Sequence, residues 1–338
     1  MNILAIESSC DETAVAIVRS GREVLTDCIA SQVALHREYG GVVPEIASRK
    51  HIEAIYGLAD QALEEANLTR TDIDAVAVTY APGLIGAVLV GVNFAKAAAM
   101  ALNKPLIPVH HIRGHIAANY IAYPELEPPF LCLVVSGGHT QIVEVKDYTE
   151  MRILGTTLDD AAGECFDKVG RVLGMPYPGG AALDKAAQQG DETKYTLPVA
   201  KPGVNPYDMS FSGLKTATLN LIHHAEQVGE ELDVPSLCAA FTAAVSETLV
   251  PRVVRALEET GYKKVAVAGG VAANSRIRKD ILEAAQKLGA EVYMPPLKYC
   301  GDNGAMIGAQ AYYEYLAGNV ADMSLNAYAT KSILGEAL

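Results

Sequence analysis

Three of the eight histidines in this chain of 338 residues lie within six consecutive positions, at His110, His111 and His115. His111 and His115 are four residues apart, so on a helix their imidazoles share one face about one turn from each other. That is the geometry of a two-histidine metal-ligand pair. A zinc protease of the His-Glu-x-x-His type needs glutamate directly after the first histidine, and Ile112 stands there instead. The spacing predicts a metal on this helical face but does not support that protease mechanism. The alternative is that these are core or surface histidines whose hydrogen-bonding groups are satisfied without a metal.

A carboxylate is needed to complete such a site for a hard or borderline metal. Asp302 is the best candidate, because it lies at a glycine-flanked turn before a predicted helix over residues 305–316. Aspartate is also a good helix N-cap, and local sequence does not separate the two roles.

Three turns built from small residues offer backbone N–H groups with little side-chain bulk, at 7–13, 136–140 and 268–274. Such turns can bind phosphate oxygens, and the third also precedes a predicted helix whose dipole favours an anion. None matches the P-loop or the G-x-G-x-x-G pattern. Three such turns in equivalent places of a duplicated fold favour nucleotide binding, but not by a P-loop or a Rossmann fold.

Four carboxylates are candidates for the chemical step or for ligand contacts. Asp11 and Glu12 lie in the first turn, where a base near a phosphate-bearing ligand would sit, and like charge would raise its pKa. Of the two we favour Asp11, because the turn backbone can fix its shorter side chain; a solvated turn is the alternative. Asp167 and Asp184 flank Gly179-Gly180 and could accept hydrogen bonds from ribose hydroxyls, or could be ordinary helix-surface charges.

The elements that must position these residues alternate between strands and helices, which predicts an α/β fold. A hairpin with a polar turn, followed later by a strand, glycine and a helix, occurs twice: at 3–18 with 75–102, and at 130–145 with 264–288. This order predicts a duplicated domain with a cleft between the copies, 1–125 and 126–338. The second copy holds an insert at about 174–233 whose prolines and glycines favour ordered loops.

Composition narrows the class of protein. The net charge is −13, which argues against a protein whose whole surface binds nucleic acid. A nucleic-acid substrate would have to be bound by a local basic patch or by a partner subunit. Six cysteines without a C-x-x-C pair predict reduced thiols. The N-terminus lacks the basic region of a signal peptide, and the apolar stretch 84–102 contains Asn93 and Lys96, which favours a buried helix. We expect a cytoplasmic protein with no membrane association, in which any disorder is confined to the tail after about Gly318.

Longer motifs resemble one known family. Residues 96–116 read K-A-x4-L-N-x-P-x-I-x3-H-x2-G-H-I, the signature of the family first called glycoproteases and now known in bacteria as TsaD, the tRNA adenosine threonylcarbamoyltransferases. The blocks ILAIESSCDETAVAIV, VSGGHT, GECFDKVGRVLG, MSFSGLKT and GGVAANSRIR also resemble that family, and together they cover the chain from end to end.

The resemblance implies an actin-like ATPase fold with two lobes. It implies one divalent metal on His111, His115 and Asp302, with iron favoured and zinc as the alternative. It also implies contacts to an adenine nucleotide or to threonylcarbamoyl-adenylate from Val134, Val135, Ser136, Gly137, Gly138, Asp167, Gly180, Asp184 and Asn274. Arg113 departs from the family, whose members often carry an acidic residue there, but it is not a ligand position.

The activity implied is acyl transfer to N6 of the adenosine immediately 3′ of the anticodon, in tRNAs reading codons that begin with adenine. The implied partners are tRNA, a TsaB-like paralogue, a TsaE-like ATPase and a TsaC-type synthase that supplies the adenylate. Three alternatives remain: a metalloprotease, a sugar or acetate kinase on the same fold, and a nucleotide-regulated scaffold without catalysis. A pure scaffold has no need of a metal, so the histidine pair separates it from an enzyme.

Overall fold

The computed structural model describes residues 1–201 and 203–334, and the chain divides into two compact units. The first unit comprises Met1–Pro128, Val145–Met151 and the segment from Pro295 onward; the second comprises Pro129–Glu144 and Arg152–Met294. The predicted boundary at residue 125 therefore lies close to the first crossing between the units. The prediction that everything after it belongs to the second copy is wrong, because the C-terminal segment packs with the first unit.

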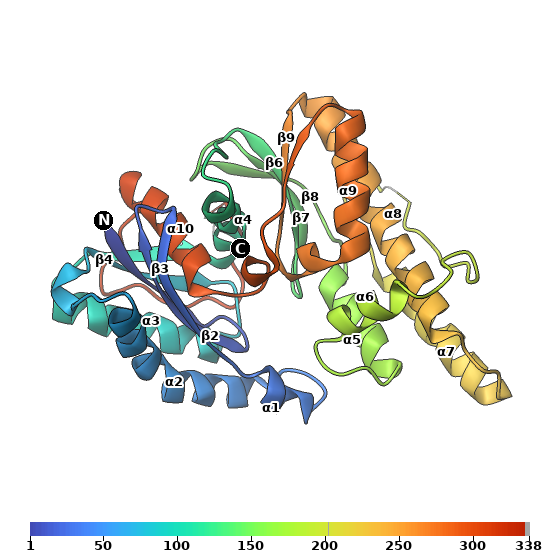
Figure 1. Ribbon diagram of the computed structural model, residues 1–338, viewed down its shortest axis with the longest axis horizontal. Helices are drawn as coiled ribbons and strands as arrows, with labels where there is room; N and C mark the ends of the chain where they lie inside the picture. The colour runs from blue at the N-terminus through green and yellow to red at the C-terminus, as the bar shows by residue number, and fades with distance from the viewer. Residues whose placement is uncertain (202, 335–338) are drawn as a thin grey trace. The chain divides into compact units, whose positions relative to one another are not determined.

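The first unit has a five-stranded sheet of order β3-β2-β1-β4-β5 (Figure 1). Its strands are β1 (Asn2–Glu7), β2 (Glu12–Arg19), β3 (Glu23–Ser31), β4 (Ala75–Ala81) and β5 (Leu106–His110), and its helices are α1 (Val33–Arg37), α2 (Pro44–Glu65), α3 (Ile85–Leu102), α4 (His111–Ala122) and α10 (Gly304–Leu316). The first three strands are antiparallel, and β4 and β5 continue the sheet parallel to β1. The predicted hairpin 3–18 is confirmed.

The second unit repeats this strand order as β8-β7-β6-β9-β10. Its strands are β6 (Phe130–Val135), β7 (Thr140–Val145), β8 (Met151–Thr156), β9 (Lys264–Ala268) and β10 (Glu291–Tyr293), and its helices are α5 (Ala162–Val172), α6 (Gly179–Ala187), α7 (Ser212–Val228), α8 (Val234–Thr260) and α9 (Ser275–Lys287). The same order in both sheets confirms the duplication. The insert differs from its prediction, because α6 and α7 lie in it; its Pro202 falls outside the described residues.

Both faces of the first sheet are buried, so its strands are apolar at nearly every position. Successive side chains alternate between the faces. Leu4 and Ile6 pack toward α2 and α3, whereas Ile3 and Ala5 pack toward α4 and α10. The functional residues predicted on α4 and before α10 thus belong to one layer.

α10 approaches the sheet more closely than side chains normally allow. A Cβ on Gly304 would lie 2.7 Å from the backbone nitrogen of Ala16, and one on Gly308 would lie 2.6 Å from Cγ2 of Val18. The two glycines are four residues apart and so face the sheet together. The absence of side chains at these two positions sets the depth at which α10 packs.

Two helices in the described part of the chain, α3 and α8, are long and apolar enough to cross a membrane by length and composition alone. The most apolar stretch of α8 is 78% buried, but that of α3 is only 33% buried. The expectation of a buried helix at 84–102 therefore holds for one face of α3 only, the face that covers the sheet through Val88 and Val92.

We expect Gly308→Ala to destabilise the protein by about 1–3 kcal/mol, because the added methyl group overpacks the contact with Val18. Gly57→Ala is the matched control: Gly57 lies within α2, where a Cβ would meet only open space, so alanine should be neutral or stabilising by up to about 1 kcal/mol. Urea unfolding followed by circular dichroism measures both. Equal stability of the two variants would show that the α10 contact tolerates a methyl group.

Candidate functional site

The predicted metal ligands come together within the first unit. α4 begins at His111 directly after β5, and the rings of His111 and His115 lie one turn apart with centroids separated by 4.6 Å. Asp302 Oδ1 lies 3.5 Å from His111 Nε2 and 3.2 Å from His115 Nε2. One ligand atom from each of the three residues lies within 4.8 Å of the others. The fold thus brings a carboxylate from the C-terminal part of the chain into ligand distance of two histidines from its first half.

The donor set fits a divalent transition metal. His115 is 1% exposed, yet neither of its ring nitrogens has a hydrogen-bond partner among the described residues. Its Nε2 is close to Asp302 Oδ1 but not in hydrogen-bond geometry, as expected for two ligand atoms that converge on a third atom. A buried imidazole without partners is costly unless something binds it. Two imidazoles and one carboxylate suit iron and zinc alike.

Glu7 is a member of this site that the sequence did not single out. Its Oε2 accepts hydrogen bonds from His111 Nδ1 at 3.0 Å and from Thr79 Oγ1 at 2.5 Å. With Nδ1 facing Glu7, Nε2 of His111 faces Asp302. A carboxylate that holds the second nitrogen of a ligating histidine fixes the orientation of the ring. The sequence offered one signal for it, because Glu7 is a charged residue at the end of an apolar strand. In the structure Glu7 is fully buried.

The two carboxylates control the protonation of His111. Burial by itself lowers the pKa of this imidazole, but Asp302 and Glu7 outweigh burial and raise the pKa to about 9. Burial raises the pKa of Glu7, and His111 reverses this, so that the pKa of Glu7 lies below its usual value. A metal that binds Nε2 at neutral pH therefore has to displace a proton.

The turn that carries Asp11 and Glu12 is buried rather than solvated: Asp11 is 6% exposed. The Glu12 carboxyl is hydrogen-bonded to Asp11 and accepts a hydrogen bond from Ser31 Oγ at 2.9 Å. Burial raises the pKa of Glu12 to about 9, and the charges of Asp11 and Asp302 add to the rise. Glu12 thus carries a proton at neutral pH, and burial is the main cause rather than like charge alone.

In the second unit, the turns at 136–138 and 268–274 meet at the carboxyl ends of β6 and β9, which pair in parallel with Val134 opposite Ala268. Gly269 has φ of +93°, and a Cβ on it would lie 2.4 Å from the carbonyl oxygen of Val135. Gly137 and Gly138 are less enclosed, and a Cβ on either would meet no protein atom within 4 Å. Parallel strands commonly bind ligands at this edge.

The remaining predicted contacts hold helix ends together. Asp167 Oδ1 accepts from the Gly179 N–H at the start of α6, next to the half-buried Gly180. Asp184 Oδ1 accepts from the N–H and the hydroxyl of Ser275, and Asn274 caps α9 through the N–H of Ile277. These side chains therefore have structural partners within the second unit.

A cavity of about 410 Å³ opens beside these helix ends in the second unit. Asp184, Ser275 and Arg276 line it, and so does Thr242, whose buried hydroxyl has no hydrogen-bond partner among the described residues. A volume of this size accommodates a small-molecule ligand.

The strand order and duplication define the class of protein as an actin-like ATPase fold. Its likeness to solved structures supports this: HypF of T. kodakarensis superimposes with a TM-score of 0.64 at 15% identity, over 96% of this chain and 49% of that one. Component A of the (R)-2-hydroxyglutaryl-CoA dehydratase of Acidaminococcus fermentans gives a TM-score of 0.54 at 16% identity, over 94% of this chain and 99% of that one.

The sequence identifies the family within that class. Residues 23–309 match the TsaD family, described as tRNA N6-adenosine threonylcarbamoyltransferase, and the chain belongs to it. Relatives of that name are 55% identical in Moorella thermoacetica, over 96% of this chain and 95% of the relative, and 53% identical in Clostridium botulinum, over 97% and 96%.

We expect His111→Ala and His115→Ala each to abolish stoichiometric metal binding while the fold is retained, because each removes one of three ligands. Affinity in the unsubstituted protein should rise about tenfold per pH unit toward pH 9, as the proton on His111 becomes easier to displace. Elemental analysis and metal titration measure both effects, and His224→Ala, on the exposed face of α7, is the control. Full occupancy in either ligand variant would exclude the assignment.

We expect Gly137→Val to weaken adenylate or ATP binding at least tenfold without loss of stability. A Cβ at this position would meet no protein atom within 4 Å, so we expect the effect to come from crowding a ligand at the turn. Isothermal titration calorimetry measures the affinity, and Gly213→Val at an equally open position on α7 is the control. An unchanged affinity would remove this turn from the binding site.

Proposed function

We propose that this protein transfers the threonylcarbamoyl group from threonylcarbamoyl-adenylate to N6 of the adenosine immediately 3′ of the anticodon, in tRNAs reading codons that begin with adenine. The product is N6-threonylcarbamoyladenosine, and the enzyme is an acyltransferase. Membership of the tRNA N6-adenosine threonylcarbamoyltransferase family, over 97% of the chain, carries this proposal. The meeting of His111, His115 and Asp302 supports it.

One divalent ion per subunit would be held by His111, His115 and Asp302, with iron favoured and zinc as the alternative. When bound, such an ion supplies Lewis-acid stabilisation of a carbonyl or phosphate oxygen. Glu7 fixes the ring of His111 for that role through Nδ1. Burial of His115 and Glu7 excludes water from the inner side of the ligand set.

The chemical step has to overcome a poor nucleophile, since the lone pair of the adenine amine is delocalised into the ring. The amine attacks the carbamoyl carbon, AMP leaves, and the amine loses a proton. A carboxylate at hydrogen-bond distance can accept that proton. Asp11 is favoured over Glu12, because the raised pKa of Glu12 keeps it protonated at neutral pH.

The adenylate would be bound by the second unit. Backbone groups of Val134, Val135, Ser136, Gly137 and Gly138 would face its phosphate, at a turn without side-chain bulk. Asn274 caps the start of α9, and Asp184 of α6 accepts hydrogen bonds from Ser275 at the same helix start, where a helix N-terminus favours an anion. Asp167 and Gly180 would complete the contacts from α5 and α6.

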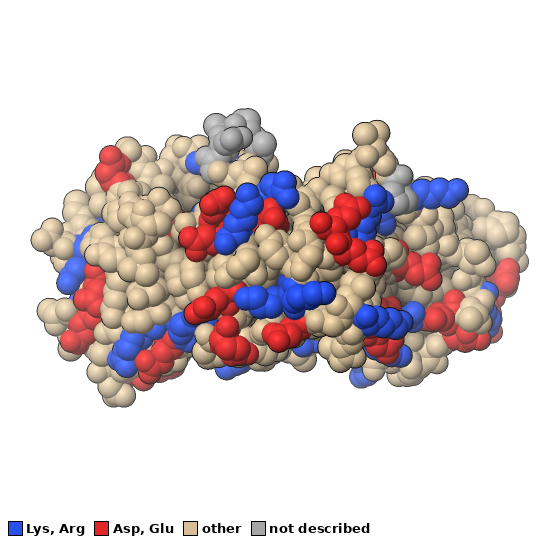
Figure 2. Space-filling view, turned by 90° about the horizontal axis from the view of Figure 1, so that it is seen from above, with Lys and Arg blue, Asp and Glu red and all other residues tan. Residues whose placement is uncertain are grey.

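The tRNA would be bound together with a partner. The chain carries a net charge of −13, and Figure 2 shows acidic and basic side chains interspersed on the face that it displays. Binding of tRNA by the lone chain should then be weak and salt-dependent. A TsaB-like paralogue would contribute to the tRNA surface, a TsaE-like ATPase would act with it, and a TsaC-type synthase would supply the adenylate, all in the cytoplasm.

The alternatives are not favoured. A metalloprotease needs a free carboxylate base beside the metal, and Ile112 occupies its place while Glu7 is already hydrogen-bonded to His111 and Thr79. A scaffold without catalysis has no use for a buried His-His-Asp set. The curated relatives are transferases in name, neither proteases nor kinases.

We expect Asp11→Asn to slow single-turnover transfer from preformed adenylate by about 100-fold or more, with normal metal content and adenylate affinity. Glu12→Gln should slow it less, because Glu12 is already protonated. Modified nucleoside in digested tRNA is quantified by mass spectrometry, with the partner proteins present.

Glu45→Gln, an exposed change on α2, is the control variant. A tRNA with guanosine at the acceptor position, which lacks the N6 amine, is the control substrate. Wild-type rates in both the Asp11 and the Glu12 variants would place the base elsewhere. Failure of the unsubstituted protein to modify the adenosine tRNA would reject the proposed function.

A further inference from the structure

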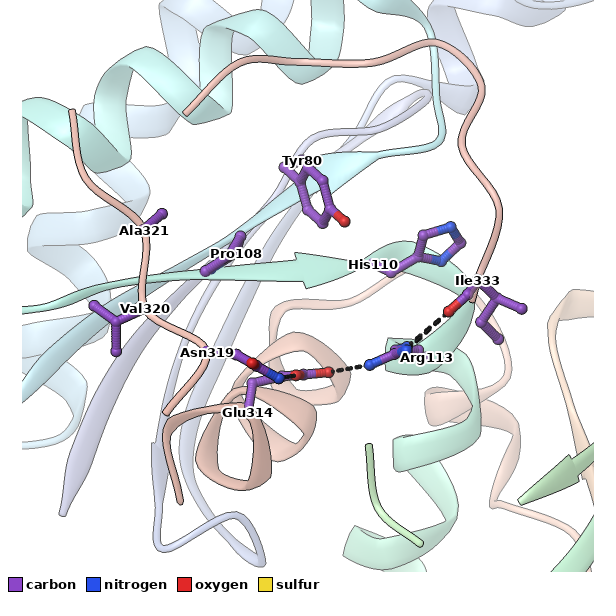
Figure 3. A pocket seen from close by; sticks show the side chains of 9 residues that line it. All are labelled: Tyr80, Pro108, His110, Arg113, Glu314, Asn319, Val320, Ala321 and Ile333. Atoms are coloured by element: carbon purple, nitrogen blue, oxygen red, sulfur yellow. Dashed lines mark hydrogen bonds and ion pairs between the residues drawn. The ribbon is translucent and has the colours of Figure 1, made fainter. Parts of the chain in front are cut away.

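The helix that carries the histidine pair also carries Arg113, which lies between the two ligands in sequence. Residues two positions apart point to nearly opposite sides of a helix, so Arg113 does not face the metal ligands. Its Nη1 donates to Glu314 Oε1 at 2.8 Å, while Nε and Nη2 donate to the carbonyl oxygen of Ile333 at 3.1 and 2.9 Å (Figure 3). One guanidinium thus joins α4 to α10 and to the C-terminal segment.

The partner of Arg113 is itself held in place. The side chain of Glu314 is 5% exposed; its Oε1 also accepts from Gln310 Nε2 at 2.9 Å, and its Oε2 accepts from Asn319 Nδ2 at 2.6 Å. A planar guanidinium between a fixed carboxylate and a fixed carbonyl oxygen has little freedom to move. The Arg113–Glu314 pair is therefore rigid, unlike an ion pair between exposed side chains.

The segment 328–333, here called the strap, is tied to the ends of three neighbouring elements. Tyr328 N–H donates to the Tyr80 carbonyl at 2.9 Å, and Gly83 N–H donates to the Ala329 carbonyl at 3.2 Å. His110, one residue before the first metal ligand, is hydrogen-bonded through Nε2 to the carbonyl oxygen of Lys331 at 3.0 Å. The strap thus crosses the ends of β4 and β5 and finishes on Arg113.

The geometry of α4 and α10 explains what this arrangement can do. The helices touch at Gly114, where a Cβ would lie 2.7 Å from Cδ1 of Ile307. Along α10, the first residue, Gly304, lies about 5 Å to one side of this contact and Glu314 about 10 Å to the other, at the usual rise per residue, and Asp302 lies two residues beyond the Gly304 end. A rotation of α10 about the contact would move both ends in opposite directions, so fixing Glu314 also fixes Asp302.

We propose that Arg113 is a positioning residue for the metal centre: with Glu314 and the strap it fixes the crossing of α4 and α10, and so the placement of Asp302 opposite His111 and His115. The inference rests on the proposed metal site. It assigns to the C-terminal strap a role in metal affinity, although the strap contributes no ligand. A cavity of about 350 Å³ beside the pair is lined by Arg113, Glu314 and Ile333.

Cobalt(II) titration of the full-length protein tests the proposal, because its visible spectrum reports coordination geometry as well as affinity. We expect Arg113→Met to weaken Co²⁺ binding about 10-fold and to alter the spectrum. Arg113→Lys should recover part of the affinity, since one ammonium keeps the charge but cannot reproduce the planar fork. Arg49→Met, which removes a 73% exposed arginine from its ion pair with Glu45, should bind like the unsubstituted protein.

Thermal unfolding of the metal-free variants separates positioning from general destabilisation. Lowered stability with unchanged Co²⁺ affinity and spectrum in Arg113→Met would overturn the proposal. Should that variant not fold, the same comparison is made with Arg113→Lys and Glu314→Gln, and unsubstituted affinity and spectra in both would overturn it. Absence of Co²⁺ binding by the unsubstituted protein would instead reject the metal site, and the positioning role with it.

Discussion

The candidate metal centre depends on how closely α10 packs against the first sheet. Gly304 and Gly308 place this helix against the backbone of β2 and the side chains of β1 and β2, and Gly114 lets α4 touch it within the same layer. Asp302 immediately precedes α10, and both histidines lie in the first turns of α4. A bulkier residue at any of these three glycines would move one ligand away from the others. Close packing of the layer is thus the condition for the chemistry.

Charge balance is the second constraint on this centre. Glu7, Asp302, Asp11 and Glu12 bring four carboxyl groups together in the interior of the first unit, and burial penalises every charge there. The protein relieves this with a proton on Glu12 and a cationic His111. A divalent cation would relieve it further, so the same carboxylates that are costly without a cation favour binding one.

In the second unit, the side chains proposed to bind the adenylate also have structural roles. Asp167, Asp184 and Asn274 bond backbone N–H groups at the starts of α6 and α9. These structural hydrogen bonds are compatible with the proposed ligand contacts, because they fix the helix ends in place.

The sequence alone determined the local structure and the chemistry of single segments. Apolar runs and glycine turns located the elements that were predicted, such as the hairpin 130–145 and the strand at 264–268, nearly to the residue, because short-range sterics and burial govern them. The helices α6 and α7 of the insert were not predicted. The i, i+4 spacing of His111 and His115 placed two ligands on one face, since the helix repeat is fixed. The family motifs indicated the activity, which cannot be inferred from residue spacing.

Only the tertiary structure decided which distant residues meet. Asp302 could have been an N-cap by its sequence, but Asn303 caps α10, and Asp302 faces the histidines. Glu7 became visible as the partner of His111, and Arg113 as a bond between α4, α10 and the strap, only through contacts across more than a hundred residues. The C-terminal segment belongs to the first unit for the same reason. Local propensity acts over a few residues, whereas packing of a layer depends on side chains from the whole unit.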